Sequence, residues 1–281
     1  MKVLVTGAEG QLAGEIIRQC MECGYEVIAH NRVTLDICDA HCLNNIVAEA
    51  KPDVVVNCAA YNDVDKAETD WQTAYMVNGI GVKNLAYACR KFGAVLMHFS
   101  SDYVFDGTSS RPYTIGDIPR PISRYAASKH LGEQLMQSHI DRFFLIRTSW
   151  VFGNGKFSFP LRLLEWAGKN RVLRIVDDQA SSPTYAADLA QASIKLLNTE
   201  NYGLFHITNS GSASKYEWAG YILNHIGWDG LLQRVKSEEF NSPAQRPKYS
   251  VLDNFPLDRV IGGTPPGWQD ATDRFMKELK R

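Results

Sequence analysis

The fold is decided by the stretch Val3-Leu4-Val5-Thr6-Gly7-Ala8-Glu9-Gly10-Gln11-Leu12-Ala13. An apolar strand over 3–6 runs into a G-x-x-G-x-x-A turn, and the turn opens a helix over 11–23. Gly7 permits the tight turn, Gly10 lets a pyrophosphate approach the backbone, and Ala13 lets the helix pack close to the strand. The free N–H groups of the helix N-terminus favour an anion. The pattern therefore predicts a phosphate-binding turn; a plain tight turn is the alternative.

Working outward from this turn, strands alternate with helices through the first half of the chain. Continuous apolar runs of this kind are buried on both faces, as in a parallel sheet covered by helices. We therefore predict an α/β fold with a Rossmann-like, doubly wound parallel sheet. The expected strands cover 3–6, 25–30, 54–56, 94–100 and 143–147, and the expected helices cover 11–23, the region after Asp39, 69–92 and 126–138.

The second half is less regular, and glycine, proline and serine interrupt it. We expect helices near 159–169, 185–198, 215–226 and 268–280, and a short strand near 204–208. No clean linker separates the two halves. The prediction is a cofactor-binding domain over 1–150 and a smaller substrate-binding lobe, mainly 151–281, interleaved with it.

Composition excludes several classes of function. The chain has 281 residues, with 30 Lys and Arg against 31 Asp and Glu, a net charge of −1. A general nucleic-acid binder carries a basic excess, and a membrane span needs about 18 apolar residues in a row; neither is present. We expect a cytoplasmic protein with reduced cysteines. Cys20 and Cys23 have a zinc-like spacing, but Cys20 falls on the apolar stripe of the first helix, so no metal site is predicted.

The end of the second strand bears on the choice of dinucleotide. NAD-binding folds place an acid there for the ribose 2′-OH, whereas this strand ends His30-Asn31-Arg32. The planar fork of Arg32 suits a 2′-phosphate. We therefore favour NADP, as NADPH, over NAD; an ordinary exposed arginine is the alternative.

A candidate catalytic set follows the fourth strand. Tyr125 and Lys129 form Y-x-x-x-K, and the i, i+4 spacing places both on one helix face. We expect the Lys129 ammonium to lower the pKa of Tyr125 toward neutrality, which makes Tyr125 a general acid. Ser101 lies at the carboxyl end of its strand, where such folds bind ligands, and its hydroxyl is placed to hold the same substrate oxygen.

In combination, these motifs resemble the extended short-chain dehydrogenase/reductases, and within them the dTDP-4-dehydrorhamnose reductase family. The resemblance runs through most of the chain. Its marks are 57–61 (NCAAY), 64–68 (VDKAE), 100–107 (SSDYVFDG), Tyr125-x-x-x-Lys129-x-x-Gly132-Glu133, 147–153 (RTSWVFG), Asp178-Gln179, Pro183-Thr184, 188–190 (DLA), Arg246-Pro247 and 250–253 (SVLD). It implies NADPH-dependent reduction of the C4 carbonyl of dTDP-4-dehydro-L-rhamnose.

The resemblance also implies site residues. For the cofactor they are Gly10, Gln11 and Leu12 at the pyrophosphate, Asp36 and Ile37 at the adenine, and Ala59, Ala60 and Tyr61 toward the nicotinamide. For the sugar they are Ser101, Asp102 and Trp150. Arg246 is a candidate for the substrate diphosphate, because arginine forks match phosphate oxygens.

The resemblance leaves two questions about assembly. Some relatives bind magnesium through glutamates near a dimer interface. Glu15 matches one such position, but no clear glutamate stands near Asp188, so magnesium is not supported. A homodimer stays an open expectation.

Two rival functions remain. One is a reductase of another nucleotide-linked 4-keto deoxysugar. The 4,6-dehydratases place Asp-Glu after the strand-end residue, whereas Asp102-Tyr103 follows here, which favours simple carbonyl reduction. The other rival is a non-catalytic NADP-binding regulatory subunit, and the complete set of Ser101, Tyr125 and Lys129 argues against it.

Overall fold

A computed structural model describes residues 1–155 and 158–279. It contains a six-stranded sheet in which every neighbouring pair is parallel. In sheet order the strands are β10 (Gly203–His206), β5 (Phe143–Thr148), β4 (Val95–Ser101), β3 (Val54–Asn57), β1 (Lys2–Thr6) and β2 (Glu26–His30). The predicted doubly wound parallel sheet is confirmed. The strand order reverses at β1, where folds of this kind bind ligands outside the carboxyl ends.

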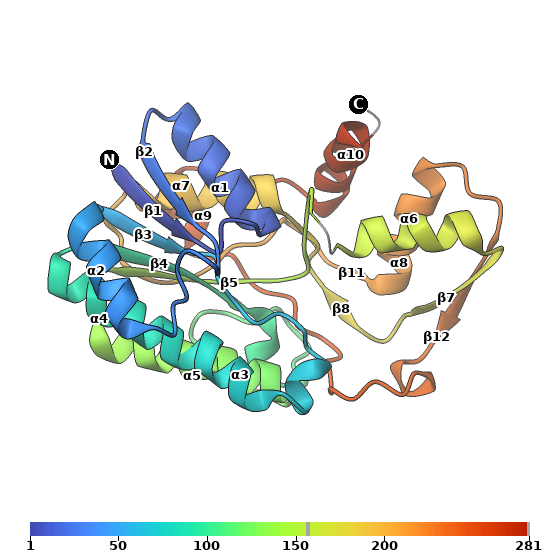
Figure 1. Cartoon of the computed structure of the whole chain (residues 1–281). Helices are drawn as coiled ribbons and strands as arrows, with labels where there is room; N and C mark the ends of the chain where they lie inside the picture. Colours follow the sequence, from blue (N-terminus) through green and yellow to red (C-terminus); the bar gives the residue numbers. More distant parts are fainter. Residues whose placement is uncertain (156–157, 280–281) are drawn as a thin grey trace.

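Helices cover both faces of this sheet (Figure 1). One face carries α1 (Gln11–Glu22), α7 (Ala186–Leu197) and α9 (Leu257–Ile261). The other carries α2 (Ala40–Ala50), α3 (Trp71–Tyr75), α4 (Val82–Phe92) and α5 (Arg124–His139). Val3 and Val5 of β1 face the first group and Leu4 faces the second, and all three are fully buried. The two apolar cores follow from the two-residue side-chain period of a strand.

A smaller lobe lies beyond the carboxyl ends of the strands (Figure 1). Its elements are β6 (Val151–Phe152), α6 (Phe159–Lys169), β7 (Val172–Val176), β8 (Ala180–Ser181), β9 (Thr184–Tyr185), β11 (Ala213–Ser214), α8 (Lys215–His225), β12 (Leu231–Val235) and α10 (Trp268–Glu278). Trp218 and Phe275 are buried at its centre. The parallel pair of β7 and β12 was not predicted, because both strands are short and half exposed.

The lobe is interrupted by elements that belong to the sheet layer. After β9 the chain returns to form α7, which packs against α1, and β10, which pairs with β5. The strand expected near 204–208 is this β10. The chain therefore crosses between the sheet layer and the lobe more than once.

The predicted helix over 69–92 contains a break. Between α3 and α4 the chain forms a π-helical segment over Met76–Gly81. Such segments are uncommon and often lie at functional sites.

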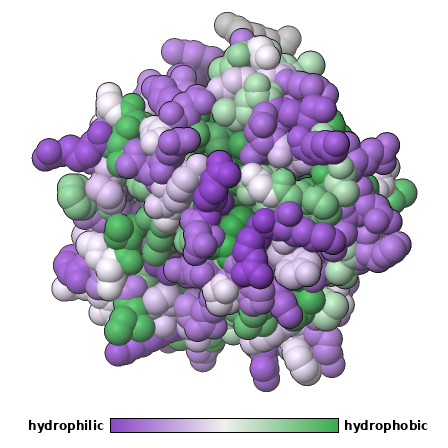
Figure 2. Space-filling model, turned by 90° about the vertical axis from the view of Figure 1, so that its left-hand side faces the viewer, coloured by the Kyte–Doolittle hydropathy of each residue, from purple (hydrophilic) through white to green (hydrophobic). Residues whose placement is uncertain are grey.

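The surface is mixed in character. The face shown in Figure 2 is mostly hydrophilic, and its hydrophobic residues lie in small separate groups. In the described part of the chain, no helix has the length and hydropathy needed to span a membrane.

Candidate functional site

The glycine turn leads from β1 into α1 as the sequence predicts. Gly7 has a φ of +68°, and a Cβ on it would lie 2.6 Å from the backbone nitrogen of Ala59. Gly10 caps α1 without a side-chain hydrogen bond, so the first N–H groups of the helix stay free for a ligand. Ala13 is fully buried against the sheet core. The turn forms a cradle that any side chain at Gly7 would fill.

A cavity of about 260 Å³ opens at this turn. Most of the predicted cofactor residues line it: Gly7, Gly10, Arg32, Asp36, Ile37, Ala59, Ala60 and Tyr61. Gln11 and Leu12 do not line it. Gln11 Nε2 donates to the carbonyl oxygen of Val151, and Leu12 packs into the core. The lining of the cavity therefore comes from the turn after β1, the segment after β2 and the segment after β3.

The rim near β2 carries an exposed cation. Arg32 forms no ion pair within 4 Å with any described residue. Its neighbour Asn31 donates to the carboxylate of Glu9 over 2.8 Å. The turn thus brings an acid to this edge, which the motif analysis missed because it searched only the strand end. The glycine cradle fits a dinucleotide pyrophosphate, and the unpaired Arg32 fits a 2′-phosphate.

The π-helical segment holds one wall of this cavity. The buried Asn78 accepts from the N–H of Tyr61 over 2.9 Å and donates to its carbonyl over 3.0 Å. Its amide also donates to the hydroxyl of Ser128, which lies between Tyr125 and Lys129 on α5. Sequence analysis missed Asn78; the available signal was a lone amide in an otherwise apolar helical stretch.

The structure brings Ser101, Tyr125 and Lys129 together. Ser101 ends β4, and Tyr125 lies in the first turn of α5, which begins after the Ser123 cap. The Ser101 hydroxyl lies close enough to Tyr125 to favour its charged form, and it donates to Oδ1 of Asp102 over 3.1 Å. Lys129 Nζ donates to the carbonyl oxygen of Phe99 over 2.6 Å. All three predicted catalytic side chains are at most 8% exposed.

The expected effect of Lys129 on Tyr125 is wrong in this structure. Burial raises the pKa of Tyr125 to about 12, and the nearby hydroxyl of Ser101 only partly offsets this. Burial also lowers the pKa of Lys129 to about 8. The ammonium of Lys129 is directed at the backbone carbonyl of Phe99, and desolvation is the largest cause of the Tyr125 shift. Tyr125 therefore keeps its proton at neutral pH, which is the form that a general acid requires.

Asp102 lies beside Ser101 and is buried. It accepts hydrogen bonds from the hydroxyls of Ser250 over 2.5 Å and Ser181 over 2.9 Å. Burial raises its pKa to about 6, although the serine hydroxyls favour the charged form. The strand β8 and the segment at Ser250, both in the second half of the chain, therefore converge on this carboxylate. The motif over 250–253 contained Ser250, but nothing in the sequence linked Ser250 or Ser181 to Asp102.

Tyr103 connects two further predicted substrate residues. The side chains of Trp150 and Arg246 lie close to its hydroxyl and favour its charged form, and its ring lies edge-on to that of Tyr125 with the centroids 6.2 Å apart. Arg246 also forms an ion pair of 2.7 Å with Asp65. Trp150 and Arg246 therefore approach Tyr125 through Tyr103, which lies next to all three side chains.

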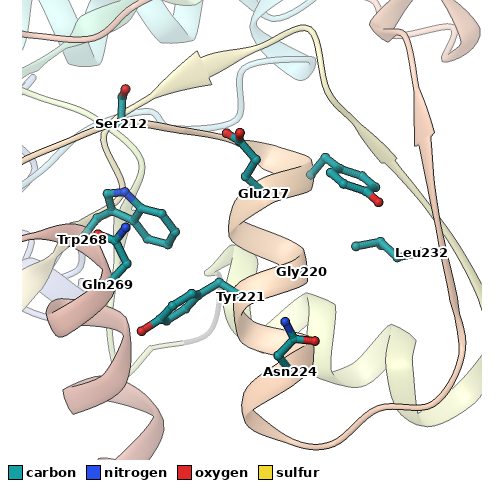
Figure 3. A pocket seen from close by; sticks show the side chains of 9 residues that line it. Ser212, Glu217, Gly220, Tyr221, Asn224, Leu232, Trp268 and Gln269 are labelled. Carbon is teal, nitrogen blue, oxygen red and sulfur yellow. The ribbon is translucent and has the colours of Figure 1, made fainter.

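A second, larger hollow of about 720 Å³ lies elsewhere, on the outer face of α8 (Figure 3). Figure 3 shows Glu217, Tyr221 and Asn224 on α8, with Trp268 of α10 to one side of this helix and Leu232 of β12 to the other. None of the predicted site residues lines this hollow, so we place the site at the smaller cavity.

The one residue that matches a magnesium position, Glu15, pairs with Arg18. Asp188, near which no glutamate was found, pairs with Arg274. Over 1–155 and 158–279, no group of three metal-ligating side chains is suitably placed for an ion.

Known proteins resemble this chain over its whole length. The family model described as RmlD substrate binding domain matches residues 1–281. The spore coat polysaccharide biosynthesis protein SpsK of Bacillus subtilis is 40% identical over 99% of this chain and 97% of its own length. A dTDP-4-dehydrorhamnose reductase of Burkholderia thailandensis is 35% identical, covering 99% of both chains.

A solved structure also matches. The dTDP-4-dehydrorhamnose reductase of Bacillus anthracis in complex with NADP superposes with a TM-score of 0.95. It is 35% identical and covers 99% of each chain.

Proposed function

This chain belongs to the RmlD substrate binding domain family, and from that premise we propose that it is an NADPH-dependent reductase of dTDP-4-dehydro-L-rhamnose. The product is dTDP-L-rhamnose, which completes the synthesis of this sugar nucleotide. The observation that carries the proposal is the buried set of Ser101, Tyr125 and Lys129 beside the glycine-lined cavity. Asn78 bonds both to the cavity residue Tyr61 and to the helix of Tyr125, which fixes one relative to the other.

The cofactor fits the cavity through residues of this chain. Gly7 and Gly10 would hold the pyrophosphate, with Gln11 and Leu12 supplying the first backbone groups of α1. Arg32 would pair with the 2′-phosphate, Asp36 and Ile37 would flank the adenine, and Ala59, Ala60 and Tyr61 would lead to the nicotinamide. When bound, NADPH supplies a hydride.

The proton comes from Tyr125. As C4 of the sugar becomes tetrahedral, the C=O electron pair moves onto oxygen, and this oxygen takes the phenol proton. Ser101 donates a hydrogen bond that positions the carbonyl and stabilises the developing charge. Lys129, fixed by the carbonyl of Phe99, holds α5 against β4 and so keeps Tyr125 in place beside Ser101.

Substrate contacts come from both parts of the chain. We propose that Asp102 and Trp150 set the face of the sugar and that Arg246 contacts the diphosphate. This division makes 1–150 the NADP-binding domain and 151–281 mainly the substrate lobe. The six free cysteines agree with a cytoplasmic location, and a homodimer stays a prediction for size-exclusion chromatography with light scattering.

The test is NADPH oxidation, followed by absorbance, with dTDP-4-dehydro-L-rhamnose against other nucleotide-linked 4-keto deoxysugars. Preferential turnover of the rhamnose precursor supports the proposal. Faster reduction of another keto sugar moves the activity to that substrate. A protein that binds NADPH and a partner enzyme but reduces no keto sugar would be a regulatory subunit.

A further inference from the structure

Lys215, the first residue of α8, has its ammonium enclosed by three aromatic rings. Lys215 Nζ lies 3.5 Å from the ring centroid of Trp150, 4.7 Å from that of Phe159 and 5.1 Å from that of Trp218. The rings of Trp150 and Trp218 are nearly parallel, with centroids 6.2 Å apart. These contacts hold the cation at a defined place through its attraction to the ring faces.

The aromatic rings leave the N–H donors of the ammonium without hydrogen-bond acceptors. An ammonium has three N–H donors, yet within 1–155 and 158–279 Lys215 makes no hydrogen bond and no ion pair within 4 Å. Burial lowers its pKa to about 7; Asp102 opposes this shift and Arg246 adds to it. These are the two charged groups that act on it, and neither is in direct contact.

The cage is built on the first turns of two helices. Lys215 is the first residue of α8, and Phe159 of its cage is the first residue of α6. The N-terminus of each helix carries partial positive charge that favours anions. Ser158, which caps α6, is buried, and its hydroxyl has no hydrogen-bond partner among the described residues. An anion bound here would accept hydrogen bonds from the Lys215 ammonium and the Ser158 hydroxyl, and the N-terminus of α6 would stabilise its charge.

We propose that Lys215 is a substrate-binding residue whose ammonium, with the N-terminus of α6, binds the diphosphate of the nucleotide sugar. The inference deepens the proposed function and takes the ligand's identity from it. Arg246 is already paired with Asp65, whereas Lys215 has no such partner, so Lys215 is the stronger anchor.

The placement agrees with the chemistry at C4. Trp150 joins Lys215 to Tyr103, and the ring of Tyr103 lies edge-on to that of Tyr125. In a hexose ring C1 lies opposite C4. With C4 at Tyr125, the diphosphate on C1 points outward, toward the layer that holds Lys215.

The experiment measures nucleotide binding by isothermal titration calorimetry rather than turnover. The probes are dTDP, UDP and thymidine, and the variants are Lys215→Met, Lys215→Arg and the exposed control Lys169→Met. Circular dichroism and NADPH affinity verify that each variant folds. We expect Lys215→Met to weaken dTDP about 10- to 100-fold, the range for a lost charge-assisted contact, and to leave thymidine and NADPH unchanged. Lys215→Arg should retain most of the affinity.

Each outcome decides the proposal. It is overturned if the wild type binds dTDP and UDP no better than thymidine, or if Lys215→Met keeps the full advantage of the diphosphate. A diphosphate advantage that disappears only in Lys215→Met, in a protein that reduces no keto sugar, supports Lys215 while refuting the proposed reaction.

Discussion

Lys129 Nζ donates to the carbonyl oxygen of Phe99 over 2.6 Å, and this bond joins α5 to β4 two residues before Ser101. Lys129, the donor, is the lysine of the Y-x-x-x-K pair. Phe99, the acceptor, lies on β4, the strand that ends at Ser101. The bond therefore sets the distance between Ser101 and Tyr125. It also makes the lysine a positioning element for the acid that it was expected to activate.

We predict that Tyr125→Phe lowers kcat about 10²- to 10⁴-fold, because it removes the general acid. The Kd for NADPH, measured by fluorescence titration, should change little. Tyr87→Phe, at an exposed position on α4, is the control and should leave both quantities unchanged. Retention of most turnover by Tyr125→Phe, with hydride transfer shown to be rate-limiting, would remove Tyr125 from this role.

Arg32→Ala should weaken NADPH use much more than NADH use, because only NADPH carries a 2′-phosphate for the guanidinium. The measurement is kcat/KM for each cofactor. The exposed Arg259→Ala is the charge-matched control. Equal losses with both cofactors would mean that Arg32 does not contact this phosphate.

The ion pair of Arg246 with Asp65 allows two contributions to be separated. Arg246→Ala should raise KM for the sugar nucleotide strongly with kcat less affected, because the substrate loses a cation. Asp65→Ala breaks the same pair but leaves the cation, so its KM should rise far less. If both variants raise KM alike, the pair only holds the loop in place.

Glu133→Gln should lower the free energy of unfolding by about 3–5 kcal/mol, because it leaves the buried Arg147 without a countercharge. Arg147 contacts both carboxylate oxygens of Glu133, at 2.9 and 2.7 Å. Urea denaturation at neutral pH measures the loss. The control Glu165→Gln breaks an exposed pair with Lys169 and should cost only about 0.3–0.5 kcal/mol. Similar losses in the two variants would contradict the prediction.

His206 should make the fold sensitive to acid. Burial lowers its folded pKa to about 3, below the unfolded reference of 6.5. The unfolded chain therefore binds more protons between these values, and stability falls as the pH drops through that window. Between pH 7 and 5 the wild type should lose about 2 kcal/mol more than His206→Asn, in which this group does not titrate.

Denaturation curves at the two pH values test this, with the exposed His41→Asn as control. The same pH dependence in the wild type and in His206→Asn would show that His206 is not the source.

The sequence by itself determined the parts that depend on local order. The G-x-x-G-x-x-A turn, the alternating apolar strands and the Y-x-x-x-K pair each lie within one element or one turn. Strand and helix periods therefore predicted the sheet, the cradle at Gly7 and the shared face of Tyr125 and Lys129. The carboxyl end of β4 could be identified as a ligand position because parallel strands end at one edge.

Only the tertiary structure decided what depends on residues far apart in the chain. Desolvation, which no motif encodes, raises the pKa of Tyr125. The hydrogen bonds of Ser250 to Asp102 and the aromatic cage of Lys215 join segments that no spacing connects. Burial and long-range contacts arise from the packing of the whole chain, so the chemical state of the site becomes definite only after folding.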